Sequence, residues 1–117
     1  MSKIDQQELQ HRLLTDANED HTNLCEALWE TLDVEQTTIA EKYSAAELAL
    51  RQLLGRGWIR LYRTDDGQQY EVIASVDVDA VLAHPNSWFP LYPDFWTAFG
   101  ATEEGRRVWQ SGEFRRH

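Results

Sequence analysis

Cysteine and histidine are the side chains in this sequence best suited to binding a metal, and the chain contains one cysteine and four histidines. His21 and Cys25 are four residues apart, so on one helix both side chains could approach a metal ion from the same face. No second pair of ligands accompanies them. Cys25 also falls in an apolar stripe, where a free cysteine behaves as a small hydrophobe. The sequence therefore predicts neither a metal site nor a cofactor.

Motifs of catalysis are also missing from the sequence. It has no glycine-rich phosphate-binding loop, no Gly-x-Ser-x-Gly turn and no His-Glu-x-x-His. Asp65 and Asp66 fall in a predicted turn, and Asp77 and Asp79 lie near a predicted helix start. Acidic residues are common in both places for structural reasons. We therefore expect the protein not to be an enzyme.

Basic side chains recur through residues 51–63, a stretch without any acidic residue. The candidate nucleic-acid-binding residues are Arg51, Gln52, Arg56, Arg60 and Arg63. They would lie on one helix and on the strand that follows it. Contact with DNA phosphates is one use for such a series. The other use, which we favour because acid is in excess, is to neutralise acidic helices of the same molecule.

The whole chain has a net charge of −9, and its acidic residues are concentrated in the first half. Residues 1–50 contain 11 acidic and three basic side chains, whereas residues 51–117 contain nine acidic side chains and eight arginines. Glu26 and Glu30 lie on the predicted exposed face of a helix in the acidic half. Such a surface repels a phosphate backbone and attracts a basic protein. We predict a basic protein partner, with nucleic acid as the less favoured alternative.

Five aromatic residues and two prolines crowd into the segment SWFPLYPDFW, residues 87–96. The rings could cover the helices as part of the core, or they could present a recognition surface, because tryptophan and tyrosine dominate interface hot spots. We expect a division in which Phe95 and Trp96 are buried and Trp88 or Tyr92 is at least partly exposed. The candidate partner-binding residues of this segment are Trp88, Phe89 and Tyr92.

Helices are predicted for most of the first half of the chain. Apolar spacing predicts a helix over residues 4–14 and another over 21–32, the second beginning at Asn18 or Asp20. The strongest helical pattern covers residues 45–54. Two capping boxes precede or open it, Thr38 with Glu41 and Ser44 with Glu47. One helix running through both boxes is the alternative to two separate helices.

Strands and short helices are predicted for the second half. In order they are a strand over 58–63, a turn at the sequence TDDG, a strand over 68–75, a short helix over 76–83, an ordered proline-containing loop, a strand over 95–101 and a last helix capped by Thr102. The chain is predicted to be one α+β domain, residues 1–117. No apolar run approaches the ~20 residues of a membrane span, and the N-terminus lacks the apolar core of a signal peptide, so we expect a cytoplasmic protein.

This order of elements resembles the winged helix-turn-helix superfamily. In that family a helix of the form L-x-x-L-x-x-x-G followed by an apolar residue leads into the first wing strand, and here the segment LRQLLGRGWI, residues 50–59, carries the pattern. A wing strand commonly ends in Thr-x-x-Gly-Arg before a final helix, and here these residues are Thr102, Gly105 and Arg106. The resemblance covers residues 21–110. It implies three or more N-terminal helices, a small antiparallel sheet that forms the wing, and a short C-terminal helix.

Two functions are therefore carried forward. The first is a non-catalytic binding module for a basic protein, such as an immunity- or antitoxin-like protein. The second is the transcriptional regulator that the winged-helix resemblance implies, with residues 51–63 on DNA. The turn at the wing tip contains Asp65 and Asp66, which would bring two negative charges towards phosphate. This chemistry favours the protein partner.

Overall fold

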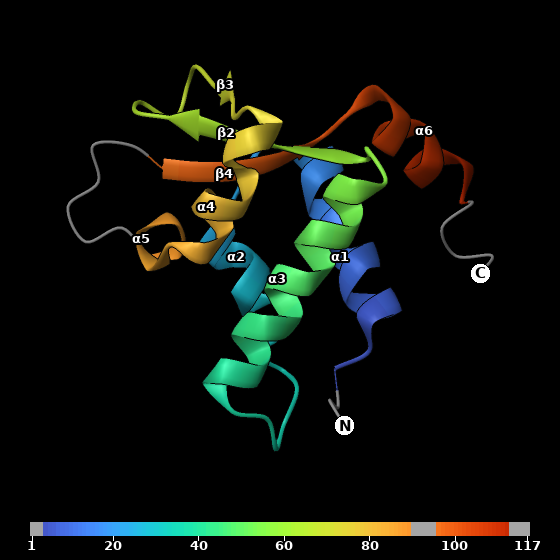
Figure 1. The fold of residues 1–117 in the computed structure, drawn as a ribbon. Helices are drawn as coiled ribbons and strands as arrows, with labels where there is room; N and C mark the ends of the chain where they lie inside the picture. The colour runs from blue at the N-terminus through green and yellow to red at the C-terminus, as the bar shows by residue number, and fades with distance from the viewer. Residues whose placement is uncertain (1–3, 90–95, 113–117) are drawn as a thin grey trace.

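An antiparallel sheet packs against a group of helices in the computed structural model, which describes residues 4–89 and 96–112 (Figure 1). The elements in chain order are α1 (Gln6–Glu19), β1 (Thr22–Asn23), α2 (Leu24–Trp29), α3 (Ile39–Gly55), β2 (Ile59–Thr64), β3 (Glu71–Val72), the 3-10 turn η1 (Ser75–Asp77), α4 (Val78–Ala83), α5 (Pro85–Trp88), β4 (Trp96–Ala101) and α6 (Glu103–Ser111). The expected α+β class is confirmed.

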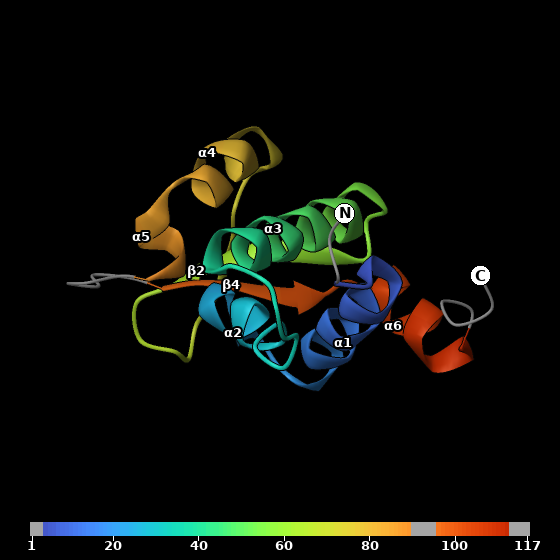
Figure 2. The ribbon, with the colours of Figure 1, turned by 90° about the horizontal axis from the view of Figure 1, so that it is seen from below.

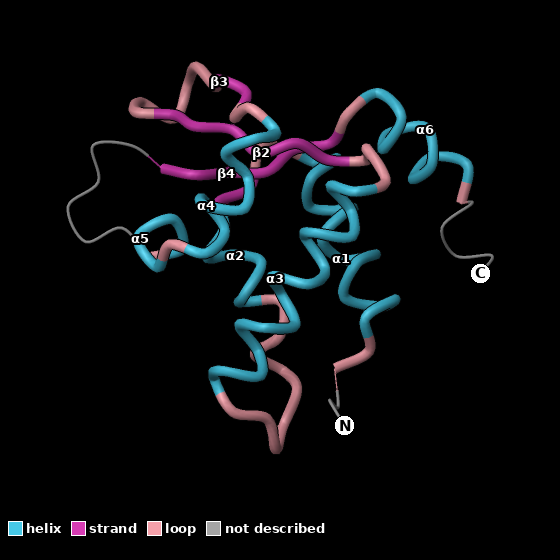
Figure 3. The backbone as a smooth tube through the Cα atoms, viewed as in Figure 1, coloured by secondary structure: helices cyan, strands magenta, loops and turns pink. Residues whose placement is uncertain are grey.

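The sheet has the strand order β1-β4-β2-β3, and its neighbouring strands are antiparallel. β2 and β4 form its centre and pair from Ile59 opposite Ala101 to Thr64 opposite Trp96. The strands expected over 58–63 and 95–101 are thus neighbours in one sheet, with β2 beginning at Ile59 and residue 95 outside the described residues. β3 is much shorter than the strand expected over 68–75, because only Glu71 and Val72 pair with β2. Figure 3 shows these strands together on one side of the helices.

α3 is the central helix of the molecule. Seen from below, it lies between α1 and α2 on one side and α4 and α5 on the other (Figure 2). Side chains from all these elements join one apolar core. Its largest fully buried members are Leu13, Leu14, Leu24, Leu50, Leu53, Ile59, Leu61, Leu82, Trp88, Phe99 and Val108.

One continuous helix, α3, includes both predicted capping boxes. Thr38 caps it: the Thr38 hydroxyl accepts a hydrogen bond from the backbone N–H of Glu41 at 3.1 Å, and the Glu41 carboxylate accepts one from the N–H of Thr38. The second box lies inside the helix. At the other end Gly57 has a φ of +75°, and the N–H of Trp58 donates to the carbonyl of Leu53 at 3.1 Å. These are the marks of a glycine-terminated helix, as the sequence predicts.

The helix predicted over residues 21–32 is much shorter in the structure. Thr22 and Asn23 instead pair with β4, and α2 begins only at Leu24. The backbone N–H of Asn23 donates to the Glu26 carboxylate at 2.9 Å, which fixes the helix start at Asn23 rather than at Asn18 or Asp20. The buried residues of α2 are Leu24, Ala27 and Leu28. Trp29, the last residue of α2, is exposed.

The segment predicted as a proline-containing loop begins with the short helix α5. Pro85 is its first residue, where a missing backbone N–H costs no helical hydrogen bond. α4 precedes it, and the N-cap residue Asp77 makes no side-chain capping bond there, contrary to expectation. In the part of the chain that the structure describes, no helix is both long and apolar enough to cross a membrane.

Candidate partner-binding site

Trp88 does not lie on the surface, so it is not the partly exposed residue of the expected alternative, Trp88 or Tyr92. Its side chain is only 1% exposed and lies at 4.6 Å, ring centre to ring centre, from Tyr43 of α3. Its indole Nε1–H donates to the backbone carbonyl of Leu82 at 3.0 Å. Burial of this large ring is favoured because its one polar atom has a partner. Trp88 therefore anchors α5 to the core.

The other aromatic residues of the segment 87–96 differ in how far they are exposed. Phe89 is 48% exposed, as a partner-binding residue would be. Trp96 is 37% exposed, which contradicts the expected burial. It is the first residue of β4 and pairs with Thr64 at the end of β2, where the core no longer covers it. Tyr92 and Phe95 lie outside the described residues.

Arg51 and Gln52 are held by contacts within the protein. The Nε of Arg51 donates to the Glu47 carboxylate at 3.0 Å, and its Nη1 donates to Asp79 of α4. These hydrogen bonds raise the pKa of Arg51, and the one to Asp79 has the largest effect. Gln52 accepts a hydrogen bond from Gln10 of α1. Arg51 therefore contacts α4 on one side of α3, and Gln52 contacts α1 on the other.

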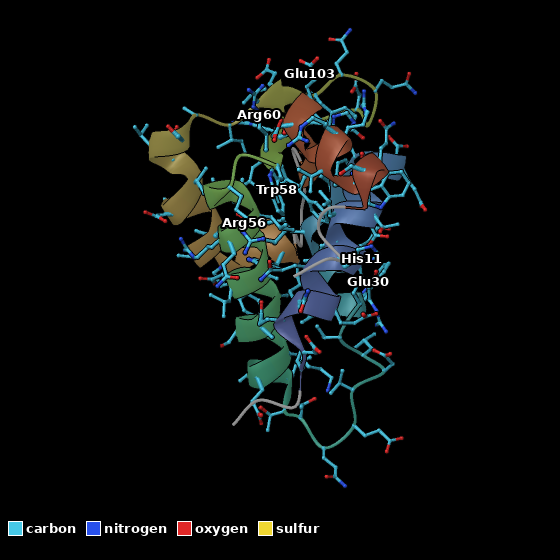
Figure 4. The ribbon with its side chains drawn as sticks, turned by 90° about the vertical axis from the view of Figure 1, so that its right-hand side faces the viewer. His11, Glu30, Arg56, Trp58, Arg60 and Glu103 are labelled. Carbon is cyan, nitrogen blue, oxygen red and sulfur yellow. The ribbon has the colours of Figure 1, made fainter. Side chains whose placement is uncertain are left out.

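Arg56, Arg60 and Arg63 are exposed and do not share one face. The Arg56 guanidinium lies 4.8 Å from the centre of the Trp58 ring. Figure 4 shows Arg56, Trp58 and Arg60 along one side of the molecule, with Glu103 of α6 near Arg60. Arg63 is three residues further along β2 and lines a cavity beside α4 instead. The structure therefore does not gather the five candidate nucleic-acid-binding residues into one surface.

Glu26 and Glu30 meet a group of other acidic residues in a surface cavity of about 400 Å³. We call this the acidic pocket. The acidic residues that line it are Asp16, Glu19, Asp20, Glu26 and Glu30. Trp29 lines it too, with 56% of its surface exposed. No lysine or arginine is among the lining residues, and the one basic side chain there is His21, whose Nδ1 lies 3.7 Å from the Asp20 carboxylate. The pocket therefore combines an excess of acidic side chains with an exposed aromatic ring.

Two helices and the short strand between them build the acidic pocket. α1 ends at Glu19, the backbone becomes extended at Asp20, and β1 leads directly into α2. The two-residue strand therefore places the end of α1 beside α2. The carboxylate of Glu26 is held in place, because it accepts the hydrogen bond that starts α2. Figure 4 shows Glu30 on the same side of the molecule as His11 of α1.

Crowding of these carboxyl groups changes the protonation of Asp16. Burial of the side chain, with a hydrogen bond to Glu30 and the negative charge of Glu30, raises the pKa of Asp16 to about 7. The charges of Glu19 and Glu26 act in the same direction. Near neutral pH, Asp16 is therefore protonated for part of the time. A positive group placed in the pocket would replace that proton.

Sequence reasoning found Glu26 and Glu30 but missed the rest of the acidic pocket. Asp16, Glu19 and Asp20 come from the preceding helix and its end, and only the turn at β1 brings them to α2. Trp29 was missed because its spacing from Leu24 and Cys25 assigned it to the buried stripe. The concentration of acidic residues before position 50 was the one signal in the sequence.

His21 and Cys25, the pair with the spacing of metal ligands, have different surroundings. His21 stacks on Tyr70 at 3.9 Å between ring centres and meets Tyr62 edge-on at 4.7 Å. Cys25 is half-buried, and burial raises the pKa of its thiol. No group of three or more histidine, cysteine, aspartate or glutamate side chains placed to hold a metal occurs within residues 4–89 and 96–112.

Three comparisons were made for this chain, with known protein families, with curated proteins and with solved structures, and none of them finds a match.

Proposed function

We propose that the protein is a non-catalytic binding module whose partner is a basic protein, and that the acidic pocket is its binding site. One observation carries the proposal: five carboxyl groups, with His21 as the one basic side chain among the lining residues, surround an exposed tryptophan. Surface carboxylates are usually spread out or paired with bases, because crowded like charges repel one another. A site that tolerates this repulsion is suited to a partner that relieves it.

Arginine is the side chain that fits the acidic pocket best. A guanidinium can stack on the Trp29 ring, and its parallel N–H groups can donate to two carboxylate oxygens at once. Binding would expel the proton that Asp16 holds near neutral pH. The surplus of acid in residues 1–50 would also speed the encounter with a basic protein. Phe89 remains available as a second contact, whereas Trp88 does not.

The winged-helix architecture belongs to the same proposal. Two features support it: α3 leads through Gly57 into β2, and β4 leads through Thr102 into α6. β1, next to α2, pairs with β4. An immunity- or antitoxin-like role in the cytoplasm is one form that a basic partner could take. In such a role the fold serves as a scaffold for the acidic pocket.

The alternative function, a DNA-binding regulator, rests on the same features of the fold. It has less support, because Arg51 pairs with Glu47 and Asp79 and because Gln52 is bonded to α1. Arg56 and Arg60 remain as the exposed bases next to the end of α3. A fold that often binds DNA does not by itself assign that function.

The proposal is tested with a fluorescein-labelled peptide of eight arginines as the probe, measured by fluorescence anisotropy. Glu19→Gln with Glu30→Gln removes two charges from the pocket and should weaken binding at least about tenfold. Trp29→Ala should weaken it about threefold, as loss of an exposed cation–π contact does. Glu35→Gln with Asp65→Asn is the matched control, because it changes the net charge equally at exposed positions outside the pocket. Equal weakening by the two double variants would show that net charge alone attracts the peptide.

A further inference from the structure

A second cavity, of about 640 Å³, lies between the sheet and the helices α4 and α5. Its volume is in the range of cavities that bind small molecules, roughly 300–1,000 Å³. Apolar side chains line part of it: Val72, Ile73, Ala80 and Val81. The polar lining residues are Arg63, Glu71, Asp77, His84, Ser87 and Thr97. The cavity is distinct from the acidic pocket and shares no residue with it.

The polar residues on the sheet side form a row across three strands. Arg63 of β2 pairs in register with Thr97 of β4 on one side and with Glu71 of β3 on the other. Residues in register share a face of the sheet, so opposite charges stand side by side at one wall of the cavity. Asp77 adds a second carboxylate from the turn before α4.

The charges of this lining favour a ligand that carries both signs. The two carboxylates would repel a simple anion. A simple cation would bind the carboxylates but would make no favourable contact with Arg63. A guanidinium has five N–H donors, so Arg63 can bind a carboxylate while it keeps its contacts within the protein.

We propose that this cavity binds a small zwitterion with an apolar body, the chemical class of the apolar α-amino acids. The carboxylate of the ligand binds Arg63, and its ammonium group binds Glu71 and Asp77. Its apolar body packs on Ile73 and Val81. Removal of this apolar surface from water adds to the affinity.

Three probes of one shape test the assignment of charge: L-phenylalanine, 3-phenylpropionate, which lacks the ammonium group, and 2-phenylethylamine, which lacks the carboxylate. Each is titrated into ¹⁵N-labelled protein and followed by NMR. L-Phenylalanine should shift the amide signals of Arg63, Ile73 and Val81. It should bind at least tenfold more tightly than either of the other two probes. No shift at these residues up to about 10 mM of L-phenylalanine would overturn the proposal.

Variants assign the two charged contacts. Arg63→Gln should weaken L-phenylalanine binding at least tenfold. Arg60→Gln is the matched control, because Arg60 lies on the same strand, is also exposed and does not line the cavity. Glu71→Gln should weaken binding of L-phenylalanine but not of 3-phenylpropionate. Equal affinity for all three probes, or equal effects of Arg63→Gln and Arg60→Gln, would contradict the proposed class of ligand.

Discussion

Gly105 of α6 lies against the backbone of Trp58, the residue that precedes β2. A Cβ atom at position 105 would stand 1.9 Å from the carbonyl oxygen of Trp58, a distance that no real Cβ atom adopts. The same corner is fixed by Thr102. Its N–H donates to the carbonyl of Trp58 at 3.0 Å, and its hydroxyl donates to that of Gly57 at 2.6 Å. The end of α3 and the start of α6 are thus joined directly through main-chain atoms.

Gly105→Ala should therefore destabilise the protein by about 3 kcal/mol or more, because backbone on both sides would have to move. The measurement is urea unfolding followed by circular dichroism. Gly55→Ala is the control: nothing lies within 4 Å of a Cβ there, and alanine is the better residue inside a helix. It should leave stability unchanged or raise it by up to about 1 kcal/mol. Similar losses in both variants would contradict the close contact.

Trp88→Ala should destabilise the protein by about 3–5 kcal/mol, the cost of truncating a buried tryptophan. The loss combines the empty space beside Tyr43 with a carbonyl of Leu82 that no longer receives the indole N–H. Phe89→Ala changes the next residue, which is half exposed, and should alter stability by no more than about 0.5 kcal/mol. Thermal unfolding of the two variants distinguishes an anchor in the core from a surface residue, and an unchanged melting temperature for Trp88→Ala would show that Trp88 is not an anchor.

The elements that the sequence predicts well are those set by local chemistry. Thr38 with Glu41 and Thr102 with Gly105 are capping interactions between residues three apart. The helix start at Thr102 was correct. For α3 the sequence offered two boxes, and the structure begins the helix at Thr38 with Ser44 inside it. The start of α2 was wrong, because it depends on the pairing of Thr22 with Phe99, far away in the sequence. The predicted exposure of the tryptophan side chains was wrong for the same reason. Trp88 and Trp96 are similar in type and setting, and only the path of the chain through space decides which one is covered.

The same distinction applies to the candidate site. Glu26 and Glu30 follow from the helical spacing of α2, whereas Asp16 and Glu19 join them only through the turn between α1 and α2. No pattern within one helix could have brought these residues together. The cavity proposed to bind a zwitterion likewise depends on strand register, which places Arg63 between Thr97 and Glu71.

Binding to random duplex DNA should be weak, no tighter than about 10 μM at physiological salt. The physical reason is that Arg51 is paired with Glu47 and Asp79, and that Arg60 and Arg63 line different cavities. Asp65 and Asp66 at the turn after β2 add negative charge. Fluorescence anisotropy with a labelled duplex measures this affinity over a series of salt concentrations. Submicromolar binding that weakens steeply with salt would favour the regulator over the protein-binding module.

Asp16 should make the stability of the protein depend on pH in a direction unusual for a carboxylate. Its pKa is raised in the folded protein to about 7 from an ordinary value of 3.8. Between these pH values the folded state binds more protons than the unfolded state, so the contribution of Asp16 to stability decreases as pH rises and is lost above about pH 7. Glu41, Asp66 and Glu104 have lowered pKa values and act in the opposite direction at lower pH, so the useful range is about pH 5.5 to 8.

Across that range the melting temperature of the wild-type protein should fall more than that of Asp16→Asn, which cannot ionise, whereas the control Glu35→Gln should follow the wild type. If the proposed site is correct, binding of the arginine peptide should tighten over the same rise in pH, because Asp16 then gives up its proton without competition. Parallel melting curves for wild type and Asp16→Asn would show that Asp16 is not crowded by the other carboxyl groups of the acidic pocket.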